Sequence, residues 1–205
     1  MKRVILGLLV GALGGCASFA APHKDYFYRL PEAVSSGVSS VGEGAIVYVP
    51  PFVASGLHGE RALIYAHDDG TSLEQYTYHY WVDSPRLLLQ QALAERLRLG
   101  GTRRIVTAPS ADAKYTVRGY IRKFERRGKD KGSAEVSLEF EVTSADSDSP
   151  EFARIYQRSV ALPDKAMASC AAAMGAAVQD IVATLASDLE TYWGASEGHT
   201  TGLRR

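Results

Sequence analysis

Residues able to act as acids, bases, metal ligands or ligand platforms crowd into one stretch, YTYHYWVDSP, which begins at Tyr76. If this stretch is a β-strand, successive side chains point to opposite faces. Tyr76, Tyr78 and Tyr80 then share one face, while His79 and Trp81 share the other. The pattern favours a packed strand over an active site. The alternative is contact with a partner or lipid, for which the three tyrosines are the candidates.

The sequence contains few other groups of residues that are typical of catalytic, metal-binding or nucleotide-binding sites. The chain has no H-E-x-x-H helix, no Walker sequence and no G-x-G-x-x-G fingerprint. Its five histidines are scattered: His23, His58, His67, His79 and His199. His67 precedes two aspartates in an Asp-Gly turn, where adjacent side chains rarely converge on one ion. We therefore expect no catalytic residue, no metal, no cofactor and no enzymatic activity.

A basic loop joins two long predicted strands, residues 114–125 and 134–144. Its four cations are Arg126, Arg127, Lys129 and Lys131. A basic residue near an anionic membrane contributes roughly 1 kcal/mol of attraction. These four residues are candidates for contact with lipid headgroups or an acidic partner. The alternative is a solvated hairpin tip whose charges oppose self-association.

The N-terminus has the layout of a secretory signal peptide. Lys2 and Arg3 precede an apolar run at residues 4–13, which is too short to span a bilayer as a helix. The run ends in Leu-Gly-Gly-Cys, which resembles the bacterial lipobox, where cleavage precedes the cysteine and its thiol receives a diacylglyceryl group. We therefore predict a signal peptide at residues 1–15 and lipid attachment at Cys16.

Residues 16–25 form the lipidated N-terminus and tether in this interpretation. Several acyl chains hold a protein stably on a membrane, whereas one does so only marginally. Residue 17 is Ala17 rather than the aspartate that tends to retain lipoproteins in the inner membrane. We predict an outer-membrane lipoprotein that faces the periplasm. Cys170 lies on an apolar helical stripe and is predicted to be a buried, structural thiol.

Composition indicates one ordinary domain. The chain has 205 residues, zero formal net charge and 46% hydrophobic residues, and nothing in it predicts nucleic-acid binding. Segments with strand character are residues 26–30, 45–49, 61–66, 74–82, 104–107, 114–125, 134–144 and 152–162. Helices are predicted from Pro85 to the glycines at 100–101, with Ser84 as the cap, and over about 165–193.

These elements predict a single α/β domain over residues 26–193, with a mixed sheet of about six strands packed with two main helices. Residues 194–205 are expected to form a flexible tail.

Several short segments, in this order, resemble the ABC-type transport auxiliary lipoproteins, which are similar to the paraquat-inducible protein C lipoproteins. After the lipobox they are YFYRL at 26–30, VYVPP at 47–51, RALIY at 61–65 and YWVDSP at 80–85, which leads into a Leu-rich helix. The last is the most specific. Many members carry an arginine before its tryptophan, and here that residue is Tyr80.

The resemblance implies a non-enzymatic accessory protein with an anticodon-binding-like or TolB N-terminal-like fold. It implies an MCE-domain protein of an ABC transporter as partner, in a system that moves lipids or other hydrophobic molecules between membranes. It also implies possible assembly into homo-oligomers. The alternatives are an envelope assembly or binding lipoprotein, either pilotin-like or peptidoglycan-associated, and an envelope hydrolase.

Overall fold

The computed structural model describes residues 23–31, 42, 44–128, 131–147 and 149–202. One mixed sheet and two helices form a single α/β domain, which confirms the predicted fold class. The strands are β1 (Tyr26–Tyr28), β2 (Ile46–Tyr48), β3 (Val53–Ala54), β4 (Ala62–Ala66), β5 (Leu73–Trp81), β6 (Arg104–Val106), β7 (Tyr115–Arg127), β8 (Ser133–Ser144) and β9 (Phe152–Ala161). The helices are η1 (Gly56–Gly59), α1 (Pro85–Arg98) and α2 (Met167–Gly202).

The long strand β7 is the central strand of the sheet. Along one edge it pairs antiparallel with β8 for its whole length, and β8 pairs antiparallel with β9. Along the other edge it pairs in turn with β2, β3 and β4, all parallel. These short segments raise the sheet to nine strands in the described residues, where about six were predicted.

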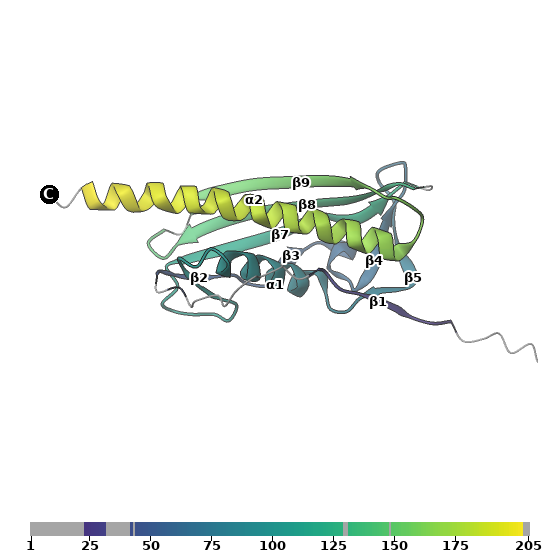
Figure 1. The fold of residues 1–205 in the computed structure, drawn as a ribbon, viewed down its shortest axis with the longest axis horizontal. Helices are drawn as coiled ribbons and strands as arrows, with labels where there is room; N and C mark the ends of the chain where they lie inside the picture. The colour runs from purple at the N-terminus through teal and green to yellow at the C-terminus, as the bar shows by residue number, and fades with distance from the viewer. Residues whose placement is uncertain (1–22, 32–41, 43, 129–130, 148, 203–205) are drawn as a thin grey trace, which may run out of the picture.

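Helix α2 lies lengthwise across β7, β8 and β9, and its C-terminal end projects past the sheet (Figure 1). The sheet face beneath it is dry, because alternate residues of β8 are apolar. The fully buried ones are Ala134, Val136, Leu138, Phe140 and Val142. The facing stripe of α2 has no exposed surface at Cys170, Met174, Val178, Ile181, Leu185, Leu189 and Trp193. The predicted stripe and the buried position of Cys170 are therefore confirmed.

The segment Met167–Ala195 is also long and apolar enough to cross a membrane, but 56% of its most apolar stretch is buried within the fold. We therefore assign α2 as the core helix of the domain. It continues to Gly202, beyond the end predicted at Trp193.

In the segment 134–144, apolar residues alternate with charged or polar ones, a pattern that predicts one dry face and one exposed, acidic face. The second face is less open than this pattern predicts. Arg122 does pair with Glu139 across the strands, with 2.6 Å between Nε and Oε2. Glu135, however, is buried and accepts hydrogen bonds from the hydroxyls of Ser133 and Ser159. Alternation correctly separated the two faces, but it did not reveal that neighbouring side chains cover part of the polar face.

Helix α1 begins at Pro85 as predicted, but its cap works differently. Ser84 occupies the N-cap position, yet its hydroxyl makes no capping hydrogen bond. Its carbonyl accepts from the N–H groups of Leu87 and Leu88, and its own N–H donates to the carboxylate of Asp83. The Pro85 ring, preset for the first helical turn, fixes the start of the helix.

A glycine in β7 allows an aromatic ring to pack directly against the backbone of the sheet. The ring of Phe52 lies against Gly119, where a Cβ atom would stand 2.4 Å from the ring, and it meets Phe140 edge-on at 5.6 Å. Any side chain at position 119 therefore displaces a fully buried ring from its place over the paired residues Gly119 and Phe140.

Gly119→Ala should lower the free energy of unfolding by about 1–3 kcal/mol, the usual cost of overpacking a core. Gly194→Ala is the matched control, because position 194 lies in α2 and nothing stands within 4 Å of its added Cβ. That substitution should leave stability unchanged or raise it, since alanine favours the helix. Urea unfolding of both variants checks the pair, and equal stabilities would contradict the packing argument.

Candidate functional site

Strand β5 is interrupted by a bulge at the stretch that is richest in candidate residues. Tyr80 pairs with Ala62 of β4 and Gln75 pairs with Ile64, so residues 76–79 stand opposite Leu63 alone. Such bulges break the ladder and re-aim side chains. Strict alternation of faces therefore fails from Tyr76 to His79.

Tyr78 is the strained residue of this bulge. Among the described residues it alone, glycine aside, has a positive φ, at 66°. This left-handed conformation costs an ordinary residue roughly 1–2 kcal/mol. In this conformation Tyr78 is 37% exposed, and its ring stacks on that of His23 with 4.7 Å between ring centroids. His23 falls in the segment 16–25 that was interpreted as a tether, and this contact packs the end of that segment against β5.

The predicted row of three tyrosines on one face is therefore wrong. The Tyr76 ring packs against the core, with its centroid 6.0 Å from Tyr65 and 6.2 Å from His79. Burial there raises the pKa of Tyr76. The Tyr80 ring instead lies beside Phe27 of β1, 5.8 Å away. Each tyrosine thus has different surroundings.

The edge strand β1 brings further rings to the bulge. It pairs with β5 in parallel, so that Tyr26 is level with His79 and Phe27 with Tyr80. The His79 ring stacks near Tyr26 and Tyr28, and its Nδ1 shares a 2.9 Å hydrogen bond with the Tyr28 hydroxyl. Burial lowers the pKa of His79, so the ring is neutral at neutral pH.

The result is a group of exposed or half-buried rings and nearby cations on both sides of the edge strand β1, which we call the aromatic surface. It consists of His23, Lys24, Tyr26, Phe27, Arg61, Tyr78 and Tyr80. Tyr26 is 48% exposed and Phe27 is 54% exposed. Lys24 Nζ lies 5.9 Å from the Tyr26 ring centroid, and Arg61 Cζ lies 5.8 Å from that of Phe27. A broad hollow of about 380 Å³ opens between Phe27, Arg61 and Tyr80.

The basic loop divides into buried and exposed residues. Arg126 is only 4% exposed and donates hydrogen bonds to the carbonyls of Lys165 and Lys131. It points inward because a register shift in β7 aligns it with Ala134, on the dry face. Arg126 is therefore not placed to contact a membrane or partner. Arg127 and Lys131 are exposed, whereas Lys129 and Cys16 lie outside the described residues.

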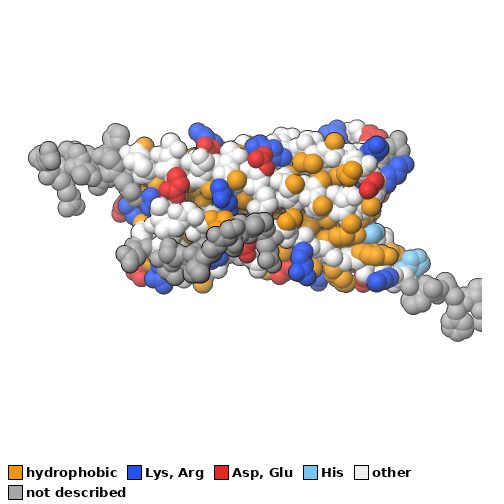
Figure 2. Space-filling view, viewed as in Figure 1, with side chains coloured by type: hydrophobic (Ala, Val, Ile, Leu, Met, Phe, Trp, Pro, Cys, Tyr) orange, Lys and Arg blue, Asp and Glu red, His pale blue; other side chains and the backbone are white. Residues whose placement is uncertain are grey.

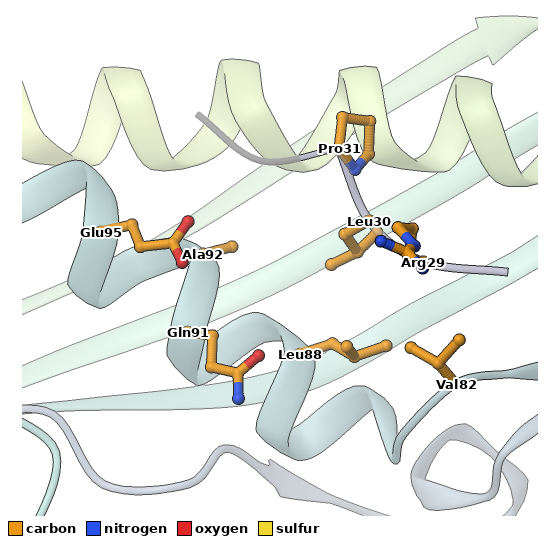
Figure 3. A pocket seen from close by; sticks show the side chains of 8 residues that line it. All are labelled: Arg29, Leu30, Pro31, Val82, Leu88, Gln91, Ala92 and Glu95. Atoms are coloured by element: carbon orange, nitrogen blue, oxygen red, sulfur yellow. The ribbon is translucent and has the colours of Figure 1, made fainter. Parts of the chain in front are cut away.

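A second hollow, of about 190 Å³, opens between α1 and the segment that follows β1. Figure 3 shows Leu30, Val82 and Leu88 gathered in it, with Gln91 and Glu95 along α1. Pockets that enclose drug-sized ligands usually measure about 300–1,000 Å³. This hollow is therefore too small to enclose such a ligand.

The described residues show no cluster of metal-ligating side chains. No group of three or more His, Cys, Asp or Glu residues in that part of the chain could hold a metal ion. Residues 194–198 spell G-x-S-x-G, but they lie inside α2 rather than at the strand-to-helix turn that a nucleophile elbow needs. Burial raises the pKa of the Cys170 thiol to about 11, so the thiol is inert at neutral pH.

Residues 28–186 match a family model described as "ABC-type transport auxiliary lipoprotein component". Among curated proteins, no sequence matches the chain.

Several solved structures are similar. A DUF330 protein from Xanthomonas campestris is 15% identical, with a TM-score of 0.72 over 84% of this chain and 99% of its own. An uncharacterized protein is 13% identical, with a TM-score of 0.67 over 82% of this chain and 99% of its own. A PelC dodecamer from Paraburkholderia phytofirmans is 15% identical, with a TM-score of 0.48 over 73% and 91%. The first two share the fold.

Tyr78→Gly should raise the free energy of unfolding by up to about 1 kcal/mol, because glycine adopts a positive φ without steric strain. Thr77→Gly is the matched control in the same bulge, at a residue without positive φ. It should lower stability, because glycine loses more backbone entropy on folding. Thermal unfolding of both variants tests the strain. A loss of stability in Tyr78→Gly as large as in Thr77→Gly would contradict it.

Proposed function

The chain belongs to the ABC-type transport auxiliary lipoprotein component family, and from that premise we propose its function in more detail. Membership gives it an accessory role in a transport system and a membrane-anchored place in the cell envelope. We propose that it is a non-enzymatic subunit of an MCE-type ABC system that moves lipids or other hydrophobic molecules. The match over residues 28–186 carries this proposal, because it spans nearly the whole folded domain.

Cys16 is the proposed attachment site. It follows a basic start, an apolar run and small residues, which is the order of a lipoprotein signal. Several acyl chains on one residue hold a protein stably at a membrane. The alanine at position 17 supports the outer membrane, with the domain in the periplasm.

The packing supports an accessory role rather than that of a carrier that encloses its cargo. Helix α2 covers the dry face of the sheet, and the stripes of β8 and α2 that meet there are fully buried. The hollow beside α1 measures about 190 Å³, and the one at Phe27 is broad and open. Neither resembles the enclosed apolar pocket that a lipid chain needs.

We propose that the partner is an MCE-domain protein, which would contact the exposed surface of the domain. Association of several copies is part of the same proposal. Among the described strands β9 pairs only with β8, so one edge of this long strand has no strand partner in that part of the chain.

Cys16→Ala should abolish fatty-acid labelling and release the protein from membranes, because it removes the proposed acceptor thiol. Cys170→Ala is the matched control, since that thiol is fully buried, and it should remain labelled and membrane-bound. Metabolic labelling with a fatty-acid analogue, followed by membrane fractionation, checks both variants. Labelling that persists in Cys16→Ala would refute the site.

The full-length lipidated protein should co-purify with an MCE-domain protein from membranes of cells that express the neighbouring permease and ATPase. An unrelated envelope lipoprotein with the same tag is the control for non-specific recovery. Quantitative mass spectrometry of the eluates measures enrichment. Equal recovery with both baits, from cells in which the MCE-domain protein is abundant, would count against the partnership.

A further inference from the structure

The aromatic surface lies where the chain leaves the fold toward Cys16. His23 is the first described residue, and seven peptide steps separate it from Cys16. An extended chain advances at most about 3.6 Å per residue, so these steps reach roughly 25 Å. Figure 2 shows hydrophobic and histidine side chains at the end of the molecule where β1 lies in Figure 1. The tether therefore keeps this end close to whatever holds Cys16.

We propose that the aromatic surface rests on the phospholipid headgroups of the membrane in which Cys16 is anchored. The proposal rests on the lipid attachment proposed above. It assigns a membrane-facing side to the domain, which attachment by a flexible tether does not by itself require.

The exposed rings suit a headgroup layer. Tyrosine is enriched at membrane–water interfaces, because its ring is apolar and its hydroxyl remains hydrated. Tyr26, Phe27 and Tyr78 are three of the large exposed hydrophobic residues among the described part of the chain, and they are contributed by the neighbouring strands β1 and β5. A cluster of this kind next to an anchor marks an interaction surface.

The charges nearby are mixed. Lys24 and Arg61 lie over the rings, and Arg127 is exposed where β7 meets the end of β4. Asp25 and Glu60 line the hollow beside Phe27. Because acids and bases nearly balance, we expect the rings rather than net charge to supply most of the docking, with only weak dependence on salt.

The proposal also orients the domain. Strand β1, where the described chain begins, lies with β5 at one end of the sheet, whereas the C-terminal end of α2 projects from the opposite end (Figure 1). With the aromatic surface on the membrane, α2 points away from it. The far end of the domain is then presented to a partner in the aqueous space.

Single thiols report the orientation directly. Thr77→Cys places a label in the bulge, and Asp112→Cys places a control label at the opposite end of β7, where residue 112 is exposed. Native Cys170 stays unlabelled because it is buried. The full lipidated chains are reconstituted into vesicles of phosphatidylethanolamine and phosphatidylglycerol. Flotation first selects the anchored protein. Quenching of a fluorescent label by aqueous iodide and by headgroup-nitroxide lipid is then measured.

The label at position 77 should lose several-fold in iodide quenching on reconstitution and gain quenching by the nitroxide lipid, while the label at 112 should change little. Equal iodide access at both positions in floating protein would overturn the proposal and leave the anchor standing. If the label at position 77 is protected from iodide but is not quenched by the nitroxide lipid, another protein rather than lipid covers the bulge. That result would overturn the proposal. If the protein does not float with the vesicles, it is not membrane-anchored, and both the proposed lipid attachment and the proposed docking are wrong.

A second set of variants tests whether the rings carry the docking. Tyr26→Ser combined with Phe27→Ser, in the Thr77→Cys background, should restore iodide quenching to the level of the control label. Ile155→Ser is the matched control, because Ile155 is 63% exposed on β9 and lies outside the aromatic surface. It should leave the protection intact. Protection that survives the double substitution in folded protein would overturn the proposal.

Discussion

The burial of α2 on the dry face of β7, β8 and β9 is the interaction on which the rest of the structure depends. Fully burying one large aliphatic side chain contributes about 1.5–3 kcal/mol, and α2 buries an entire stripe of them. This packing fixes β7, and β7 in turn holds β2, β3 and β4 along its other edge. Arg126 reinforces the arrangement, because its guanidinium reaches the carbonyl of Lys165 just before α2 begins.

The well-packed core allows an irregular backbone conformation at the edge of the sheet. The bulge in β5 holds Tyr78 in a costly conformation and exposes its ring, while β1 adds Tyr26 and Phe27 beside it. Strain of this kind persists only where the surrounding structure over-determines it. Here Trp81, fully buried against Phe124, fixes the end of β5 beyond the bulge. The core thus positions a surface that the sequence of one strand would not form alone.

Local patterns predicted much of the fold. Helical spacing located the buried stripe of α2 and the place of Cys170, and alternation identified the dry face of β8. Features that depend on the pairing of strands far apart in the sequence could not be predicted. The bulge exists because Gln75 and Tyr80 pair with β4 residues only two apart, so the tyrosines lost their common face. Arg126 was expected at a hairpin tip, but a register shift turned it inward. Strand β3 was too short to detect, and the hydroxyl of Ser84 gave a false indication of a cap.

In the orientation proposed above, the anchored domain turns its bulged end to the membrane and its far end to its partners. Photo-crosslinking in living cells tests it most directly, with a benzophenone amino acid at position 78 of the full chain. We expect a phospholipid adduct, visible as lipid phosphate on the protein. An adduct with another protein at this position, and none with lipid, would contradict it.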